Sequence, residues 1–149
     1  MATLADWLSF RCRHEEIKKA LEKTLLECEH SVSLNEFYTL YFLSKSEDKA
    51  LAIQDLSQKV GLSPSATSRM LQQFEHSCGV IMRTTCKTDK RSTFIHLTPL
   101  GTKRLAIFLK AIDPVLKRCG PYSPQKIMIQ RALPGIISWQ GPFTASFEL

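Results

Sequence analysis

Two helical segments joined by a very short turn constrain the fold of this chain more than any other feature. The first segment, residues 52–61, has three apolar residues at helical spacing: Ile53, Leu56 and Val60. Gly61 stands where a left-handed residue closes a helix, and Ser63-Pro64 is a cap followed by a proline in the first turn of the next helix. Because only Leu62 and Ser63 lie between the segments, they are predicted to form a helix-turn-helix.

The second helix of this pair has an unusual polar face. Four of its residues are predicted to face inward: Ala66, Met70, Leu71 and Phe74. The residues predicted to face solvent carry mostly hydroxyls and amides: Ser65, Thr67, Ser68, Arg69, Gln72, Gln73 and His76. Long exposed helices usually carry Glu and Lys, whereas short hydrogen-bonding side chains suit the reading of base edges in a major groove. An ordinary solvated helix face is the alternative.

A basic hairpin is predicted directly after this helix. Residues 80–85 and 92–97 are rich in β-branched side chains and read as two strands. The loop between them carries three cationic residues: Lys87, Lys90 and Arg91. Such a hairpin can reach DNA phosphates and a neighbouring minor groove, although a charged turn that keeps a sheet edge soluble has the same composition.

The positive charge of the chain is concentrated in one stretch. The 149 residues carry a formal net charge of +6, and residues 83–118 hold nine basic and two acidic residues. A clustered excess indicates a polyanionic partner, with a solvated basic face as the alternative. The length fits one domain, and no apolar run is long enough to span a membrane. Asp6 stands where a signal peptide carries basic residues, so a cytoplasmic protein is expected.

Two helices are predicted before the helix-turn-helix. Residues 4–30 carry apolar side chains at helical spacing: Trp7, Leu8, Ile17, Ala20, Leu21 and Leu25. Residues 34–45 follow a capping box formed by Ser33 and Glu36, and they are apolar almost all round. This second segment is therefore predicted to be the buried central helix, followed by a charged loop over residues 46–50.

A long helix is predicted after the hairpin, over residues 99–118. Its apolar stripe is predicted to comprise Leu105, Phe108, Leu109, Ile112 and Leu116, and Pro114 is expected to kink it. The sequence after Arg118 is rich in Pro and Gly, and at most residues 125–133 are predicted to be helical there.

In this order of elements the chain resembles the MarR family of bacterial transcriptional regulators over residues 31–105. The best match is residues 88–101, which are similar to the family's wing motif, an Asp-x-Arg followed by a strand ending Leu-Thr-x-x-Gly. Five residues fall on its fixed positions: Asp89, Arg91, Leu97, Thr98 and Gly101. Similar residues also occupy the helix-turn-helix at Leu56, Leu62, Ser63, Ser68 and Leu71.

The resemblance implies a mainly α fold with a small β-hairpin wing, a winged helix-turn-helix with long N- and C-terminal dimerisation helices. It divides the chain into a dimerisation helix (1–32), a DNA-binding domain (33–100) and a C-terminal helix with a tail that also dimerises (101–149). It implies a homodimer on a pseudo-palindromic operator of double-stranded DNA, acting as a repressor relieved by a small ligand or an oxidant. The residues expected at the DNA are Ser63, Ser65, Thr67, Ser68, Arg69, Gln72, Gln73, Lys87, Asp89, Lys90 and Arg91. In such proteins the Asp of the wing motif pairs with a basic residue and fixes the wing.

The chain also departs from the family's pattern. Family members dimerise through interleaved terminal helices, whereas the segment after Arg118 is interrupted by Pro and Gly. Only Arg83 remains of a Glu/Arg-rich pair that commonly follows the recognition helix. An alternative function follows from the altered end: a winged-helix protein-interaction module that has lost DNA binding.

A few residues are candidates for regulation rather than DNA contact. Cys12 lies roughly where thiol-sensing members of the family keep a reactive Cys, with an inert thiol as the alternative. Phe37 and Tyr41 would line a pocket for a small aromatic effector if this chain follows the family, and core packing is the alternative. Five cysteines without a C-x-x-C favour reduced thiols over a disulfide framework or a zinc site.

No enzyme, metal or cofactor is predicted from the remaining motifs. No spacing supports a Ser-His-Asp or Cys-His catalytic site, and there is no phosphate-binding loop. Glu27-Cys28-Glu29-His30 contains metal-capable side chains, but neighbours along a helix point apart.

Overall fold

The computed structural model of the chain describes residues 3–85 and 93–119, which form five helices and three short strands. In chain order these are α1 (Leu4–Leu26), α2 (Leu34–Lys45), β1 (Ala50–Ala52), α3 (Ile53–Val60), α4 (Pro64–Cys78), β2 (Ile81–Thr85), β3 (Thr93–Leu97) and α5 (Pro99–Cys119). The mainly helical fold with a small antiparallel hairpin is the one predicted. The tail after residue 119 and the wing loop lie outside the described residues.

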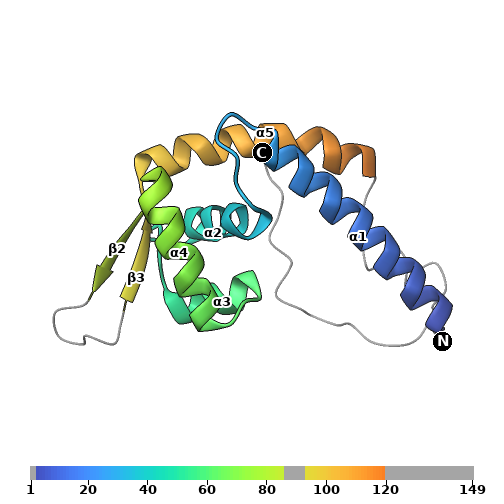
Figure 1. Ribbon diagram of the computed structural model, residues 1–149, viewed down its shortest axis with the longest axis horizontal. Coiled ribbons are helices and arrows are strands. Elements are labelled where there is room, and N and C mark those ends of the chain that lie inside the picture. The colour runs from blue at the N-terminus through green and yellow to red at the C-terminus, as the bar shows by residue number, and fades with distance from the viewer. Residues whose placement is uncertain (1–2, 86–92, 120–149) are drawn as a thin grey trace.

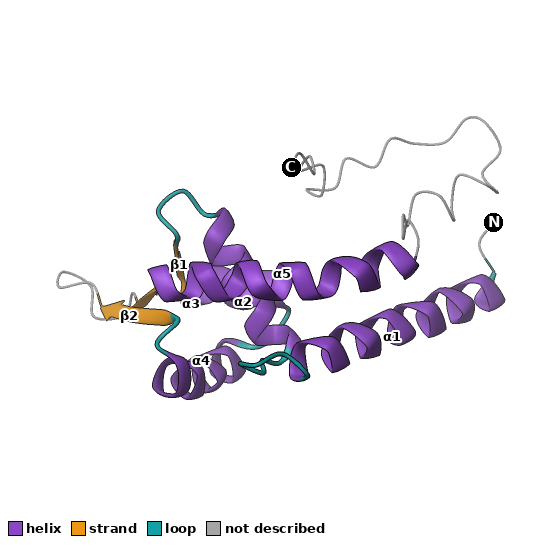
Figure 2. Ribbon diagram, turned by 90° about the horizontal axis from the view of Figure 1, so that it is seen from above, coloured by secondary structure: helices purple, strands orange, loops and turns teal. Residues whose placement is uncertain are grey.

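The elements from α2 to β3 form a compact winged unit, and α5 runs along its top (Figure 1). Helix α1 lies against α5 and extends away from the winged unit, as the view from above also shows (Figure 2). The Arg13 guanidinium on α1 donates to the carbonyl of Cys119 at the end of α5, over 2.9 Å. None of the described helices is long and apolar enough to cross a membrane.

Helix α2 occupies the centre of the core, as the sequence predicts. Its observed bounds match the predicted ones, and its capping box is formed: the Ser33 N–H donates to Glu36 Oε2 over 2.7 Å, and Ser33 Oγ accepts from the Glu36 N–H over 3.3 Å. Side chains from α1, α3, α4, β3 and α5 pack around its buried residues: Leu25, Leu56, Leu71, Phe74, Ile95, Leu105 and Phe108. Burial on this scale is the main source of the fold's stability.

The sheet has the order β1-β3-β2, with both pairings antiparallel. Strand β1 was not predicted, because residues 46–50 read as a charged loop. Its three residues become a strand only by pairing with the far edge of β3, where Leu51 lies opposite Ile95. Such a pairing joins residues distant in sequence and leaves no local period to detect.

The turn from β3 into α5 is held by Thr98 and Gly101. The Thr98 hydroxyl donates to the Gly79 carbonyl over 2.9 Å, and its backbone N–H donates to the Val80 carbonyl over 3.0 Å. A Cβ at position 101 would lie within 2.2 Å of the same Val80 oxygen, so only glycine fits. These contacts join the end of α4, the start of the wing and the start of α5.

Three predicted boundaries or faces were wrong. Helix α1 ends at Leu26 rather than residue 30, because the chain turns there to bring Val32 into the core. On α5, Leu109 and Leu116 are partly exposed and Val115 is buried instead, since the core stripe follows steps of four and three residues from Gly101. Trp7, one of the apolar residues at helical spacing in the first segment, is 58% exposed rather than part of the apolar face that packs on the core.

Candidate nucleic-acid interface

The turn between α3 and α4 has the geometry that the sequence predicts. Gly61 is left-handed, with φ +80°, and its N–H donates to the Ser57 carbonyl over 2.9 Å. The Leu62 N–H donates to the same carbonyl over 3.1 Å, which completes the turn within two residues. Ser63 then caps α4 by accepting from the Ala66 N–H over 3.2 Å. The caps on both sides fix the direction in which α4 leaves the turn.

One face of α4 presents a continuous row of polar side chains to solvent, which we call the polar stripe. Its members are exposed and follow steps of four, three and four residues: Ser65, Arg69, Gln72 and His76. These steps keep all four on the side opposite Leu71 and Phe74, which are buried. Of the other predicted contact residues, Gln73 is exposed beside the stripe, Ser63 is exposed at the cap, and Ser68 is half-buried at its edge.

His76 was not among the residues expected at the DNA, although it continues the polar stripe by one turn. The signal was available in the sequence, because position 76 lies four residues after Gln72 and so shares its face. An imidazole there can donate or accept a hydrogen bond at a base edge or a phosphate.

Thr67 was predicted to face the DNA, and this is wrong. Its side chain is 0% exposed and lies on the core face of α4 with Leu71 and Phe74, four and seven residues further on. A hydroxyl side chain was expected at the surface, but position 67 continues the buried face that contains Leu71 and Phe74. Its Oγ1 makes no hydrogen bond within the described part of the chain.

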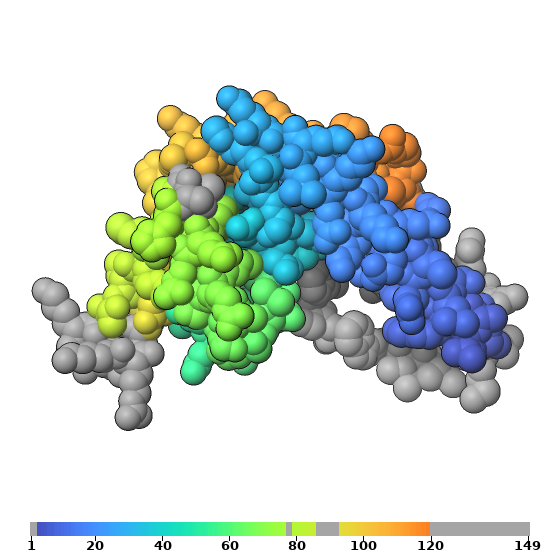
Figure 3. Space-filling model, in the orientation of Figure 1, coloured from blue at the N-terminus to red at the C-terminus, as the bar shows by residue number. Residues whose placement is uncertain are grey.

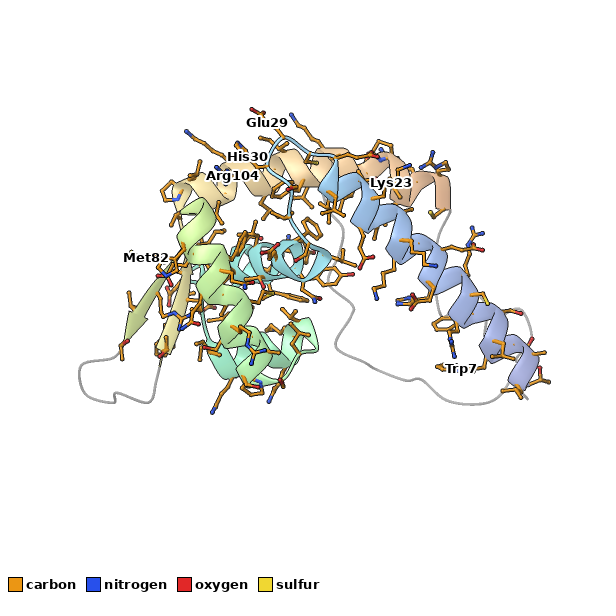
Figure 4. All side chains as sticks on the ribbon, viewed as in Figure 1. Trp7, Lys23, Glu29, His30, Met82 and Arg104 are labelled. Atoms are coloured by element: carbon orange, nitrogen blue, oxygen red, sulfur yellow. The ribbon has the colours of Figure 1, made fainter. Side chains whose placement is uncertain are left out.

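The wing strands extend beside α4, while the predicted contact residues of the wing lie outside the described residues. These are Lys87, Asp89, Lys90 and Arg91. The outer face of the strands is joined by a hydrogen bond of 2.8 Å between Thr84 Oγ1 and His96 Nε2. Met82 is exposed on the same outer face, away from the helices (Figure 4).

The charge of Arg69 is available for a ligand within the polar stripe. Its side chain is exposed, and the ion pairs among the described residues involve other cations, namely Lys23, Arg83 and Lys117. A guanidinium in this position can donate in parallel to O6 and N7 of guanine or to a phosphate.

The residues predicted to be regulatory have different surroundings. Phe37 is buried in the core, and Tyr41 is half-buried with its ring centre 6.5 Å from that of Phe37. The ammonium of Lys45 lies 5.7 Å from the Tyr41 ring. Burial raises the pKa of the neighbouring Tyr38 phenol, and the carboxylate of Glu22 on α1 raises it further. Cys12 is exposed on α1.

Within the described part of the chain, no cluster of three or more His, Cys, Asp or Glu side chains could hold a metal ion. Residues 27–30, which contain metal-capable side chains, lie after the end of α1 rather than on a helix. The prediction that these four residues are neighbours along a helix is therefore wrong.

Comparison with known proteins gives the same fold. Residues 32–93 match the model of the MarR family. AbsC, a MarR family transcriptional regulator from Streptomyces coelicolor, aligns with a TM-score of 0.67 at 20% identity, over 87% of this chain and 89% of that chain. No curated protein matches the sequence.

Two of the similar structures contain DNA. Sco3205, a MarR family transcriptional regulator from Streptomyces coelicolor, is in complex with DNA and aligns with a TM-score of 0.65 at 20% identity, over 90% of this chain and 79% of that chain. A mutant MarR from E. coli complexed with operator DNA aligns with a TM-score of 0.69 at 13% identity, over 85% and 88% of the two chains. Residues 32–93 therefore form a MarR-family domain, and the chain around it has the fold of the MarR-family transcriptional regulators.

Proposed function

We propose that this chain is a sequence-specific DNA-binding transcriptional regulator. The observation that carries the proposal is the polar stripe, an exposed row of hydrogen-bonding side chains on the second helix of a helix-turn-helix. In this proposal α4 enters a major groove, with Arg69 and Gln72 at base edges and Ser63, Ser65 and Gln73 at bases or phosphates. Similar proteins with the same fold have been solved on DNA, which supports this use of the helix.

The wing adds the second DNA contact in this proposal. Strands β2 and β3 lead to the basic residues Lys87, Lys90 and Arg91, which would reach phosphates or a flanking minor groove. Arg91→Ala is expected to weaken operator binding and to flatten its dependence on salt concentration, because fewer counterions are released. Unchanged affinity and an unchanged salt slope in this variant would remove the wing from the proposed contact.

A homodimer is the proposed binding form, with residues 1–32 and 101–149 as its dimerisation regions. In the single chain, the first part of α1 leaves three large apolar side chains exposed: Leu4, Trp7 and Leu8. Helix α5 exposes Ile107, Leu109 and Leu116. Apolar surface on two adjacent long helices favours association, since burying it in a second copy removes it from water. Two copies would present two α4 helices to successive major grooves of a pseudo-palindromic site.

Repression relieved by a small molecule or an oxidant is the regulatory part of the proposal. The half-buried ring of Tyr41 would contact an aromatic effector, and the exposed thiol of Cys12 would meet an oxidant. For the thiol, the test is operator affinity before and after peroxide treatment of the wild type and of Cys12→Ser. An oxidant effect that survives in Cys12→Ser would exclude Cys12 as the sensor.

A gel shift combined with a size measurement tests the proposal as a whole. The full chain is titrated onto duplex DNA from upstream of its own locus at several salt concentrations, with light scattering for its mass. We expect a dimer that shifts the duplex in a salt-sensitive manner, and an Arg69→Ala variant with about ten- to a hundredfold weaker binding. A monomer indifferent to DNA would overturn the proposal and favour the protein-interaction module.

A further inference from the structure

Helix α4 and strand β2 are connected by a half-buried ion pair. Glu75 Oε2 on α4 lies 3.5 Å from Arg83 Nε on β2, and the two side chains are 33% and 23% exposed. The other two ion pairs within the described residues join positions four apart on a single helix, and their side chains are more than half exposed. Glu75–Arg83 is thus the one described ion pair that joins two elements, and it is more shielded from water than the other two.

Arg83 has little other compensation for its charge. It stands two residues after the buried Ile81 on β2, so it shares the face of Ile81, and it lies opposite the buried Ile95. Its side chain is therefore on the inner face of the sheet. Its Nε and Nη2 atoms are shut off from solvent and make no hydrogen bond in the described structure. At 3.5 Å the contact with Glu75 is an ion pair rather than a well-formed hydrogen bond. Among the described residues, the Glu75 carboxylate is therefore the one charged partner of this half-buried guanidinium.

We propose that Glu75 and Arg83 are positioning residues that set the wing against the recognition helix for DNA binding. The inference rests on the proposed function and deepens it. A partly buried guanidinium that loses its carboxylate partner has no counter-charge beside it, and it is stabilised by moving further towards water. Because Arg83 belongs to β2, this movement shifts the strands that lead into the wing while α4 keeps its place in the helix-turn-helix.

The positioning role and the net charge of the protein predict opposite effects of Glu75→Gln on DNA affinity, so the proposal can be tested. Glu75→Gln removes one negative charge from a DNA-binding protein, and by long-range electrostatics alone it would tighten DNA binding. Glu47→Gln is the matched control, because Glu47 is an exposed acid in the loop before β1 and forms none of the described ion pairs. The positioning role predicts weaker binding for Glu75→Gln than for the wild type and for Glu47→Gln.

The experiment uses the full chain and a duplex of upstream DNA that the wild type shifts. We expect Glu75→Gln to bind about five- to tenfold more weakly than the wild type. Hydroxyl-radical protection should be lost at the edges of the footprint and kept at its major-groove centre. In an Arg83→Met background, Glu75→Gln should no longer weaken binding, because the cation that needs compensation is absent.

Each outcome decides between positioning and a simpler role. Equal or tighter binding by Glu75→Gln, or weakening that persists with Arg83→Met, would overturn the positioning role. A large fall in the thermal midpoint of Glu75→Gln with protection lost evenly across the footprint would do the same, because the pair would then support folding only. Failure of the wild type to shift any upstream duplex would overturn the proposed function itself, and it is seen before any variant is compared.

Discussion

The winged unit and the first half of α1 differ in how much of their apolar surface a single copy of the chain buries. In the winged unit, the helix ends at Gly61 and Ser63 are capped, and the apolar faces meet in a common core. The first half of α1 stands apart from that unit in the space-filling view (Figure 3). There Leu4 is 72% exposed, and Trp7 stacks on Phe10 of the same helix with the two ring centres 5.8 Å apart.

One copy of the chain is enough to stabilise the winged unit, whereas the apolar face of α1 needs a second surface to cover it. The winged unit buries its apolar side chains within one copy of the chain, together with Leu25 of α1 and with the inner face of α5. Its stability is therefore expected to be independent of protein concentration. The exposed apolar face of α1 gains stability only when something covers it, so its order is expected to depend on association. The polar stripe lies on α4 in the winged unit, so it has a rigid support before any partner binds.

The largest contrast is expected from truncating one leucine in each region. Leu71→Ala leaves a cavity in the core of the winged unit and is expected to lower the free energy of unfolding by about 2–5 kcal/mol. Leu8→Ala removes an exposed side chain of α1 and is expected to change it by less than about 0.5 kcal/mol at dilute monomer concentrations. Urea unfolding measures both, and equal effects would show that the two regions are not distinct.

Gly101→Ala tests how tightly α5 is attached to the winged unit. The added methyl group meets the Val80 carbonyl, a backbone atom that cannot turn aside. We expect a loss of about 1–3 kcal/mol of unfolding free energy from overpacking. Ala106→Gly, at an exposed position of the same helix, is the control and should lose only about 1 kcal/mol, its helix propensity. A smaller loss at position 101 than at position 106 would mean that the close approach does not exist.

Trp7→Glu tests whether the exposed apolar face of α1 forms the dimer contact. A charge in the exposed apolar face should raise the dimer dissociation constant at least about tenfold, equivalent to about 1.4 kcal/mol. The thermal unfolding midpoint of the full chain, followed by far-ultraviolet circular dichroism at a concentration where the protein is monomeric, should stay unchanged. Sedimentation analysis provides the dissociation constant, and a variant that dimerises like the wild type would place the dimer contact elsewhere.

Thr84→Val is expected to give the smallest effect among the substitutions within the winged unit. It removes the hydrogen bond between Thr84 and His96 on the exposed face of the wing strands, while a β-branched residue keeps the strand propensity. The expected loss is about 0.5–1 kcal/mol of unfolding free energy, measured by thermal denaturation. A loss as large as that of Leu71→Ala would indicate that the wing face contributes as much as the core.

Local signals predicted most of the winged unit from sequence. Capping residues such as Ser33 and Ser63, the glycine at position 61 and the apolar periods of α2 and α4 act within a few residues, so their effects can be read in order along the chain. The polar stripe could be predicted for the same reason, because three of its members were identified by type and spacing.

The failures share a different physical origin. Strand β1 exists only through its pairing with β3, and Val115 replaces Leu116 in the core because the direction of α5 is fixed by its packing on the winged unit. Thr67 was assigned by chemical type against its position, and position decided the outcome. The Glu75–Arg83 pair joins residues on two elements, and no local pattern in the sequence marks such a contact.

The four residues from Thr98 to Gly101 have a consequence for how this sequence can change over generations. Thr98 makes two hydrogen bonds to the segment before the wing, and Gly101 has no room for a side chain. Pro99 and Leu100 between them are exposed. Natural variants of this sequence should therefore differ often at positions 99 and 100 and rarely at positions 98 and 101. Short segments of this kind, fixed at the ends and variable inside, can remain recognisable after most of a chain has diverged.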